Sequence, residues 1–249
     1  MPAAPVMLRW GTGRRRLLAA ASASLLAGAE LGAQPGRAGM PRSEALLTVH
    51  TFGDSVLDCG RYNDRGVHPG QLLVQNDDAL FPEFIGRDLR SRGPALLDHR
   101  AVDGATVDGL PGQARGLRVQ TPALALLTIG GNDLLRGLAA DTGSGMRVFE
   151  RKLGAFVQQL PIRPLLVASV YDPTFGDDAR NFLGVEATIA RANHRRVNAI
   201  IAALAQRPGV RFVDLHAHFL GGDPSWFTRT IEPSLRGASE VRRAFLTAL

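Results

Sequence analysis

Short apolar runs alternate with longer segments of helical spacing along most of the chain. Continuous apolar runs of strand length lie at residues 46–52, 95–101, 124–129, 165–170 and 210–215. Helical spacing of apolar residues predicts helices at residues 71–92 (broken near Pro82), 149–160, 185–206 and 239–249, the last with Ser239 as its expected N-cap. Buried strands separated by helices indicate a parallel sheet covered on both faces. The sequence therefore predicts a three-layer α/β/α fold with a five-stranded parallel sheet.

Three of the five strand exits carry residues that are suited to catalysis. Ligands of open parallel sheets bind at the carboxyl ends of the strands, so the residues that leave each strand matter most. Gly-Asp-Ser at residues 53–55 follows the first strand, Asp-Gly-Ala at residues 103–105 follows the second, and Gly-Gly-Asn-Asp at residues 130–133 follows the third. Each of these segments alone is common turn chemistry. Their occurrence after successive strands, in this order, favours a functional site.

This arrangement resembles the SGNH/GDSL hydrolases, which carry Gly-Asp-Ser after strand one, a glycine after strand two and Gly-x-Asn-Asp after strand three. The resemblance extends from about Thr48 to the C-terminus and implies a flavodoxin-like strand order of 2-1-3-4-5. Carried over to this chain, it makes Ser55 the nucleophile. It also implies an oxyanion hole formed by the Ser55 N–H, the Gly104 N–H and the Asn132 side chain. Losing one such donor typically costs about 3–4 kcal/mol of transition-state stabilisation.

The chain departs from the family pattern at the position of the general base. Family members carry Asp-x-x-His shortly before the last helix, whereas this chain has Arg229 and Glu232 at those two positions. A carboxylate is about two pKa units less basic than imidazole, which removes at least about 3 kcal/mol of driving force for proton transfer. A neighbouring arginine would lower the pKa of Glu232 further. Glu232 is therefore one candidate base, and an Arg229–Glu232 ion pair in place of the Asp–His pair is an equally good interpretation.

Histidines elsewhere could replace the missing base. His216 and His218 follow Asp214 with a period of two inside the fifth predicted strand, and His218 lies nearest the carboxyl end. His218 is thus the rival base, although the ends of strands one and five would be roughly 14 Å apart. His68, in the loop after Ser55, is another alternative, and a site without a base is a further one. The Asp-x-His-x-His pattern is more typical of core or loop-anchoring histidines than of a metal site, so no metal is expected.

Three further residues are candidates for contact with the substrate. Asp54 and Asp133 adjoin the serine and the asparagine of the predicted site. Trp226 could form an apolar wall for an acyl or aryl group, and it could equally anchor its loop by packing. No cofactor is expected.

The positive charge of the chain is concentrated at its N-terminus. The formal net charge is +6, but residues 1–42 contain six arginines and one acidic residue, so the rest of the chain is nearly neutral. A neutral folded part does not steer onto phosphates, which disfavours a nucleic-acid partner. Mean hydropathy near zero argues against a multi-spanning membrane protein, and no stable membrane insertion is expected.

Residues 1–40 form a segment ahead of a single predicted domain at residues 41–249. Residues 14–16 are three arginines that precede a small-residue apolar run, which is the order of a secretory signal with a loose twin-arginine character. The run is too short for a spanning helix. Alternatively, translation starts at Met40 and the upstream stretch is spurious. The lone Cys59 excludes an internal disulfide and fits either location, so the sequence leaves exported and cytoplasmic locations open.

The sequence thus predicts a serine ester hydrolase that acts on a small-molecule carboxylic or acyl ester. The alternative is an SGNH-fold protein that binds an ester or a glycan in the same pocket without hydrolysing it. Both stay open because function must be argued from the site and not from the fold.

Overall fold

Five parallel strands form the central sheet of the computed structural model, which describes residues 45–249. The expectations for residues 1–40 lie outside the described residues. The strands are β1 (Leu47–Gly53), β2 (Ala95–His99), β3 (Ala123–Thr128), β4 (Leu165–Ala168) and β5 (Val210–Val213). Their order in the sheet is β2-β1-β3-β4-β5, and every neighbouring pair is parallel. The expected parallel sheet and its strand order are confirmed.

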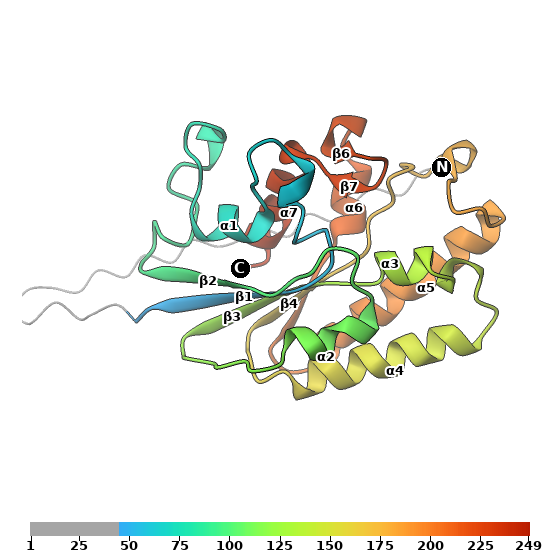
Figure 1. Ribbon diagram of the computed structural model, residues 1–249, viewed down its shortest axis with the longest axis horizontal. Coiled ribbons are helices and arrows are strands. Elements are labelled where there is room, and N and C mark those ends of the chain that lie inside the picture. The colour runs from blue at the N-terminus through green and yellow to red at the C-terminus, as the bar shows by residue number, and fades with distance from the viewer. Residues whose placement is uncertain (1–44) are drawn as a thin grey trace, which may run out of the picture. The chain divides into compact units, whose positions relative to one another are not determined.

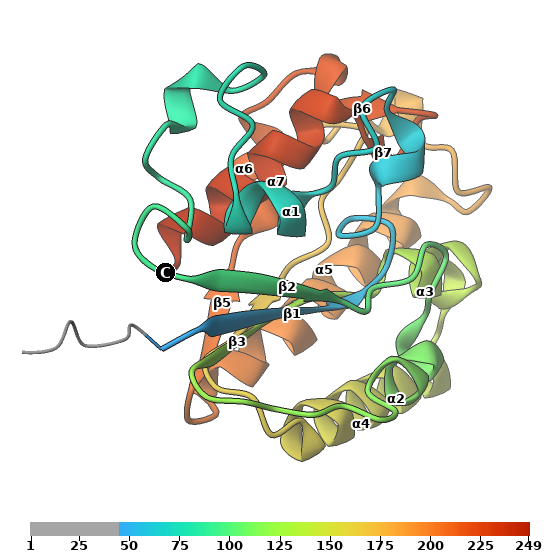
Figure 2. The same ribbon diagram turned by 60° about the vertical axis from the view of Figure 1, so that its left-hand side comes forward.

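Helices cover both faces of this sheet (Figure 1, Figure 2). One layer contains α2 (Leu110–Gln113), α4 (Ser144–Gln159) and α5 (Ala187–Ala203), and the opposite layer contains α1 (Pro69–Val74), α6 (Leu215–Leu220) and α7 (Leu235–Thr247). The short helix α3 (Gly131–Leu135) follows β3, and a hairpin of β6 (Phe227–Thr228) and β7 (Glu232–Pro233) precedes α7. One-turn 3-10 helices occur at Gly60–Tyr62, Pro82–Phe84, Val107–Gly109, Leu138–Ala140, Asp178–Arg180, Leu204–Gln206 and Pro224–Trp226.

The hydrophobic core lies in two parts, one on each face of the sheet. Every residue of β3 and β4 is buried, as their continuous apolar sequences require. On one face the sheet packs against α4 and α5, for example through Phe149 and Val197. On the other face it packs against α6 and α7, for example through Phe219 and Phe245. The carboxyl ends of the strands are thereby held at one edge, where the predicted site residues follow them.

The predicted helix at residues 71–92 is wrong over most of its length. Helix α1 ends at Val74, and a loop follows it before the 3-10 turn at Pro82–Phe84. In this loop Asp77 Oδ1 accepts the N–H groups of the two residues that end at Leu80, and Asp88 Oδ2 accepts the Asn76 N–H. Side chains that satisfy backbone groups locally compete with helix formation, which explains the early end of α1.

The N-cap of helix α7 lies five residues earlier than predicted. Its cap is Ser234, whose Oγ accepts the Gly237 N–H at 3.1 Å. Ser239 is instead buried inside the helix, where its Oγ accepts a hydrogen bond from Arg242. A serine inside the helix carried the same local signal as the true cap, so the predicted start was wrong.

The fifth strand also ends earlier than predicted. Asp214 caps helix α6 with its Oδ1, which accepts the Ala217 N–H at 3.0 Å. His216 and His218 therefore lie on a helix and not on a strand, which is a correction to the predicted pattern. An aspartate at a helix start is a strong cap, and here it overrides the apparent alternation.

Candidate active site

The turn after β1 depends on glycine. Gly53 has a φ of +123°, and a Cβ atom there would lie 1.7 Å from the backbone oxygen of Thr128 in β3. The Gln113 side chain brackets the same residue, because its Oε1 accepts the Gly53 N–H and its Nε2 donates to the Gly53 oxygen, both at 2.7 Å. The chain can leave β1 this close to β3 only through a residue without a side chain.

Ser55 follows this turn directly and is 8% exposed. Asp54, which lies between Gly53 and Ser55 in the sequence, is buried. Its Oδ1 accepts the Thr128 hydroxyl at 2.8 Å and the Val56 N–H at 3.2 Å. Burial raises the pKa of Asp54 to about 6. Asp54, which sequence analysis placed beside the substrate, thus ties the serine's turn to β3.

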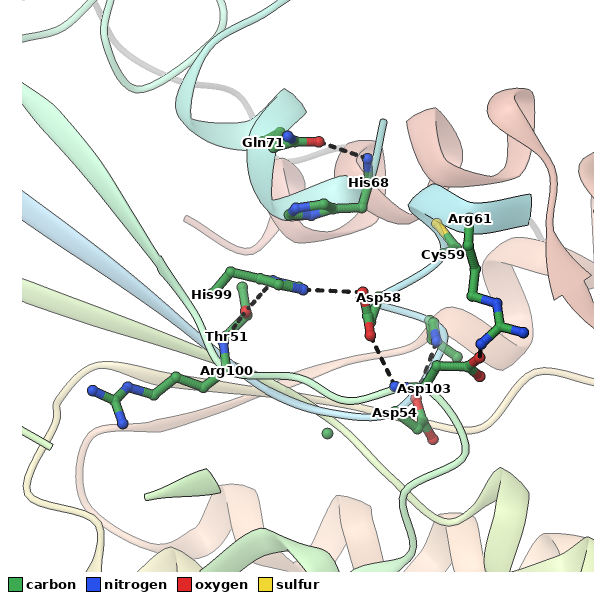
Figure 3. A network of polar contacts seen from close by, with 12 residues as sticks. Thr51, Asp54, Asp58, Cys59, Arg61, His68, Gln71, His99, Arg100 and Asp103 are labelled. Carbon is green, nitrogen blue, oxygen red and sulfur yellow. Dashed lines mark hydrogen bonds and ion pairs between the residues drawn. The ribbon is translucent and has the colours of Figure 1, made fainter. Parts of the chain in front are cut away.

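A chain of polar contacts joins the loop after β2 to the turn after β1 (Figure 3). Asp58 Oδ1 lies 3.3 Å from His99 Nε2, and Asp58 Oδ2 accepts the Asp103 N–H at 2.9 Å. Asp103 Oδ2 in turn accepts the Tyr62 hydroxyl at 2.7 Å and pairs with Arg61 at 2.9 Å. These contacts fix the two loops against each other.

The exits of β2 and β3 are joined by the side chains of α3. Gly104 has a φ of +76°, within the turn that follows β2. Asn132 Nδ2 donates to the Ala105 oxygen at 3.0 Å, and both carboxylate oxygens of Asp133 accept the Val107 N–H at 3.2 Å. Burial raises the pKa of Asp133 to about 6. Asp133 therefore holds the β2 loop and does not line the cavity described below.

Three N–H donors at these exits have no protein acceptor. Across residues 45–249, the backbone N–H groups of Ser55 and Gly104 donate no hydrogen bond, and the Asn132 amide uses one of its two hydrogens. Ser55 and Asn132 line one cavity, whereas Gly104 borders a more open hollow. Donors that are fixed by the surrounding fold but unused are available to an anionic ligand without breaking a protein hydrogen bond.

Glu232 is carried by the β6–β7 hairpin. The hydroxyl of Tyr171, at the exit of β4, donates to the Ile231 oxygen at 2.6 Å and so anchors the hairpin beside the sheet. On the other side, a Cβ atom on Gly237 of α7 would lie only 2.0 Å from the Trp226 oxygen. The hairpin can therefore pack this closely on α7 only because residue 237 is a glycine.

The side chain of Glu232 reaches Ser55. The Ser55 hydroxyl lies close enough to lower the pKa of this carboxylate, although no hydrogen bond of ordinary geometry joins the two side chains within residues 45–249. Its Oε2 atom is buried without a hydrogen-bond partner among the residues that the structure describes. Burial raises the pKa of Glu232, and the neighbouring Ser55 hydroxyl and the charges of Arg61 and Arg229 offset this only in part. The expected lowering of this pKa by arginine is present, but desolvation outweighs it and the net shift is upward.

Arg229 does not pair with Glu232. No ion pair within residues 45–249 joins the two side chains. The Arg229 guanidinium instead lies over the Tyr62 ring, with Cζ 5.1 Å from the ring centroid. Arg229 and Thr230 form the hairpin turn with φ values of 47° and 74°. The alternative interpretation, an ion pair between Arg229 and Glu232, is therefore wrong.

His218, the rival base, makes its contacts within the α6–α7 layer. Its Nε2 lies 3.0 Å from Glu240 Oε2, and its ring centroid lies 5.4 Å from that of Trp226. Trp226 is buried against this histidine and Phe219 and does not line the cavity beside the serine. Of the two interpretations that the sequence left open for Trp226, its packing favours an anchor for the loop, and it does not line the cavity beside the serine.

His68, the other alternative, stacks on His99 with ring centroids 4.0 Å apart. Its Nδ1 is buried without a partner in the described part of the chain, and burial lowers its pKa to about 4. The hydrogen bonds within residues 45–249 include none from His68, His218 or Glu232 to Ser55. Of these candidate bases, Glu232 is the one whose pKa the neighbouring Ser55 hydroxyl lowers.

A cavity of about 130 Å³ opens beside Ser55. It lies between the end of β3, helix α3, the loop that follows β4 and the first turns of α5. Ser55, Asp54 and Asn132 border it at one end. Within the described residues, no group of three or more His, Cys, Asp and Glu side chains could hold a metal ion. No helix among those residues is long and apolar enough to cross a membrane.

Two residues that shape the site carried little signal in the sequence. Gln113 brackets Gly53 from 60 positions away, and nothing in its local sequence indicates that contact. Tyr171 leaves β4 at the catalytic edge, so a place near the site could be expected, but its bond to the hairpin could not.

Solved structures with a similar fold include several esterases and lipases. The lipase Lip_vut3 from a goat rumen metagenome has a TM-score of 0.58 at 15% identity, covering 81% of this chain and 97% of its own. The acetylxylan esterase Axe2 from Geobacillus stearothermophilus has a TM-score of 0.56 at 20% identity, covering 81% and 93%. LAE5, an α/β hydrolase from the metagenome of Lake Arreo in Spain, has a TM-score of 0.57 at 22% identity, covering 83% and 95%. At these identities the likeness shows the fold.

The family itself follows from the sequence match. No curated protein matches the chain. A model of the GDSL-like lipase/acylhydrolase family matches residues 51–238, which include all three strand exits and the hairpin. Since this match spans most of the sequence, the chain belongs to the GDSL-like lipase/acylhydrolase family, and it is a hydrolase that acts on ester bonds.

Proposed function

We propose that the protein cleaves carboxylic esters with Ser55 as the nucleophile and Glu232 as the general base. The observation that carries this proposal is the position of Glu232, which the β6–β7 hairpin holds beside the Ser55 hydroxyl so that this hydroxyl lowers its pKa. A serine hydroxyl is a weak nucleophile until a base within hydrogen-bond reach takes its proton. Glu232 is the candidate whose carboxylate neighbours the Ser55 hydroxyl, whereas His218 and His68 are engaged in other contacts.

In the first half of the reaction Ser55 Oγ attacks the ester carbonyl carbon and its proton passes to Glu232. The tetrahedral oxyanion accepts hydrogen bonds from the Ser55 N–H, the Gly104 N–H and the free hydrogen of Asn132 Nδ2. When the C–O bond to the alcohol breaks, Glu232 returns the proton to the departing oxygen, leaving an acyl-serine. Water then attacks this ester, Glu232 takes its proton, and Ser55 leaves with that proton as the carboxylic acid is released.

Burial of Glu232 supports its role as a base. A carboxylate at its ordinary pKa is too weak a base to take the proton of a serine hydroxyl efficiently. Desolvation moves the pKa of Glu232 upward, toward the range in which general bases work. The unpartnered Oε2 acts in the same direction, since no donor within the described residues hydrogen-bonds to it and stabilises the charge. Glu232 thus keeps part of the basicity that the change from histidine removes.

Hydrolysis of p-nitrophenyl butyrate by wild type, Ser55→Ala and Glu232→Gln tests the proposal. Ser55→Ala should abolish turnover and covalent labelling by a fluorophosphonate. Glu232→Gln keeps the shape of the side chain and should lower kcat by about 10²- to 10⁴-fold, the usual contribution of a general base. Glu150→Gln, an exposed glutamate of α4, is the matched control and should leave kcat unchanged.

His218→Gln separates the two candidate bases, because it should leave kcat within about twofold of wild type if Glu232 is the base. A large loss in His218→Gln with little loss in Glu232→Gln would reject Glu232 as the base. Wild-type protein that neither turns over an ester nor reacts with a fluorophosphonate, yet binds an ester or a glycan, would establish the non-hydrolysing alternative instead.

A further inference from the structure

Two arginines lie against one tyrosine ring beside the proposed base. The guanidinium carbon of Arg61 lies 5.2 Å from the centroid of the Tyr62 ring, and that of Arg229 lies 5.1 Å from the same centroid. Arg61 comes from the loop after β1, whereas Arg229 comes from the turn of the β6–β7 hairpin. Both guanidinium groups are near enough to Glu232 for their charges to lower its pKa. The tyrosine therefore holds two cations from distant segments of the chain close to Glu232.

A carboxylate from the loop after β2 fixes the ring and one of the two cations. Asp103 Oδ2 accepts the Tyr62 hydroxyl at 2.7 Å. The same oxygen lies 2.9 Å from the Arg61 guanidinium (Figure 3). Arg229 is exposed, and no carboxylate among residues 45–249 forms an ion pair with it. The cluster thus contains one arginine that a carboxylate holds in place and one that pairs with no carboxylate directly.

The hairpin turn holds Arg229 in a strained backbone conformation. Arg229 has a φ of 47° and Thr230 a φ of 74°, a region that residues with side chains rarely adopt and that is least favourable for a β-branched residue. The Arg229 oxygen accepts the Ile231 N–H at 2.9 Å, and the Ile231 oxygen accepts the Tyr171 hydroxyl, so the turn is fixed on the sheet side. Strain of this kind occurs mostly at functional sites, where the surrounding structure maintains it. It therefore indicates a function for the side chains at this turn.

The proposed reaction places the alcohol portion of the ester beside these arginines. Glu232 returns a proton to the alcohol oxygen, so that oxygen must lie next to the Glu232 carboxylate. Neither arginine lines the cavity beside Ser55. We propose, on the basis of the proposed ester hydrolysis, that Arg61 and Arg229 bind an anionic group, a carboxylate or a phosphate, on the alcohol portion of the substrate. A guanidinium matches either anion through its paired N–H donors.

Proton transfer during the reaction strengthens this binding. Before the reaction, the charges of Asp103 and Glu232 balance those of the two arginines. When Glu232 takes the proton of Ser55 it becomes neutral, and the negative charge passes to the oxyanion, where the donors of the oxyanion hole balance it. The two arginines then face a single carboxylate, so an anionic group on the alcohol is bound more tightly in the tetrahedral intermediate than in the ground state. Such an interaction raises kcat more than it lowers KM.

Three butyrate esters with similar phenols test this proposal. The phenols are 3-hydroxybenzoate, 3-hydroxyphenyl phosphate and the neutral 3-hydroxybenzamide, and each enzymatic rate is divided by the rate of hydroxide-catalysed hydrolysis of the same ester. The carboxylate ester, the phosphate ester or both should exceed the amide ester by about tenfold in kcat/KM, mainly through kcat, and the faster of the two identifies the anion. Addition of about 0.5 M NaCl should reduce this advantage, because salt screens exposed charges. Equal normalised rates for the three esters would overturn the proposal.

Substitution of the arginines provides the second test. Arg229→Gln should lower the ratio of anionic to neutral ester hydrolysis about fivefold or more, and Arg61→Gln should also lower it, whereas Arg229→Lys should keep part of it. Both esters are measured on one preparation, so the ratio does not depend on how much of a variant is folded. The matched control is Arg151→Gln, an exposed arginine of α4, which should leave the ratio unchanged.

The outcomes separate this inference from the proposed hydrolysis. An Arg229→Gln protein that keeps the wild-type ratio, or that loses activity equally toward the anionic and the neutral ester, would overturn the anion site while leaving ester hydrolysis intact. Wild-type protein that hydrolyses none of the three esters and does not react with a fluorophosphonate would overturn both.

Discussion

Gly237→Ala is expected to reduce catalysis far more than it reduces stability. The added Cβ atom would lie 2.0 Å from the Trp226 oxygen, a separation at which something must move. The Trp226 oxygen is a backbone atom and the added Cβ is bonded directly to the backbone, so no flexible side chain can move to relieve the contact. The hairpin that carries Glu232 must therefore shift away from α7 by about 1 Å or more to restore an ordinary contact.

Two opposing contributions set the cost in stability. Overpacking of this kind typically costs about 1–3 kcal/mol. Alanine is about 1 kcal/mol better than glycine inside a helix, and residue 237 lies in the first turn of α7, so part of the cost is offset. The expected net loss is about 1–2 kcal/mol, or a fall in Tm of roughly 2–8 °C for a chain of this size. The fold survives.

The loss in rate is expected to be larger because the base moves. Misplacing a catalytic group by about 1 Å can cost on the order of 100-fold in rate. Urea denaturation and p-nitrophenyl butyrate hydrolysis, measured on the same preparation, separate the two effects. The control is Gly112→Ala in α2, where a Cβ atom would meet nothing within 4 Å, and which should keep both stability and rate. A folded Gly237→Ala protein with wild-type kcat would refute the claim that packing of the hairpin on α7 places the base.

Three further results are expected. Tyr171→Phe removes the hydroxyl that donates to the Ile231 oxygen, which should cost about 1–2 kcal/mol in urea denaturation and lower kcat; retained kcat would show that this bond does not position the hairpin. The acid limb of kcat/KM should lie above pH 4.5, because burial raises the pKa of Glu232 and protonation removes the base, and a pH–rate profile with its limb at or below 4.5 would contradict this. Between pH 6.5 and about 4, wild type should lose up to about 3 kcal/mol of stability that His68→Gln keeps, since the unfolded chain takes up a proton that folded His68 rejects; parallel stability profiles would argue against it.

The sheet could be predicted from the sequence because its strands are continuous apolar runs. β3 and β4 are buried along their whole length, and no helix of that composition and length would fit between the flanking turns. The errors lie where helices start and stop. Asp214 and Ser234 cap α6 and α7 through single hydrogen bonds from side chain to backbone, and apolar spacing does not reveal which polar residue makes such a bond.

The site likewise contains residues that could be predicted from the sequence and a contact that could not. The three strand exits could be predicted because parallel strands bring their carboxyl ends to one edge, where Ser55 and Asn132 indeed border one cavity. The contact between Ser55 and Glu232 could not be predicted, because it depends on how a hairpin late in the chain packs. That packing rests on the Tyr171 hydroxyl, which bonds to a residue 60 positions away, and on the missing side chain of Gly237, and apolar spacing reveals neither contact.

The two departures from the family pattern, Arg229 and Glu232, are related through the charge of the proposed base. A histidine base starts neutral and becomes a cation, so a carboxylate beside it stabilises the transition state and fixes the tautomer. A glutamate base starts as an anion and becomes neutral, and it has no tautomer to fix. A neighbouring carboxylate would favour its protonated form, which is inactive as a base, whereas the charge of Arg229 favours the ionised form without a direct ion pair that would hold it too strongly. Exchanging the base for a carboxylate would therefore remove the need for an aspartate at residue 229, while the charge of Arg229 lowers the pKa of Glu232 and burial offsets that loss of basicity.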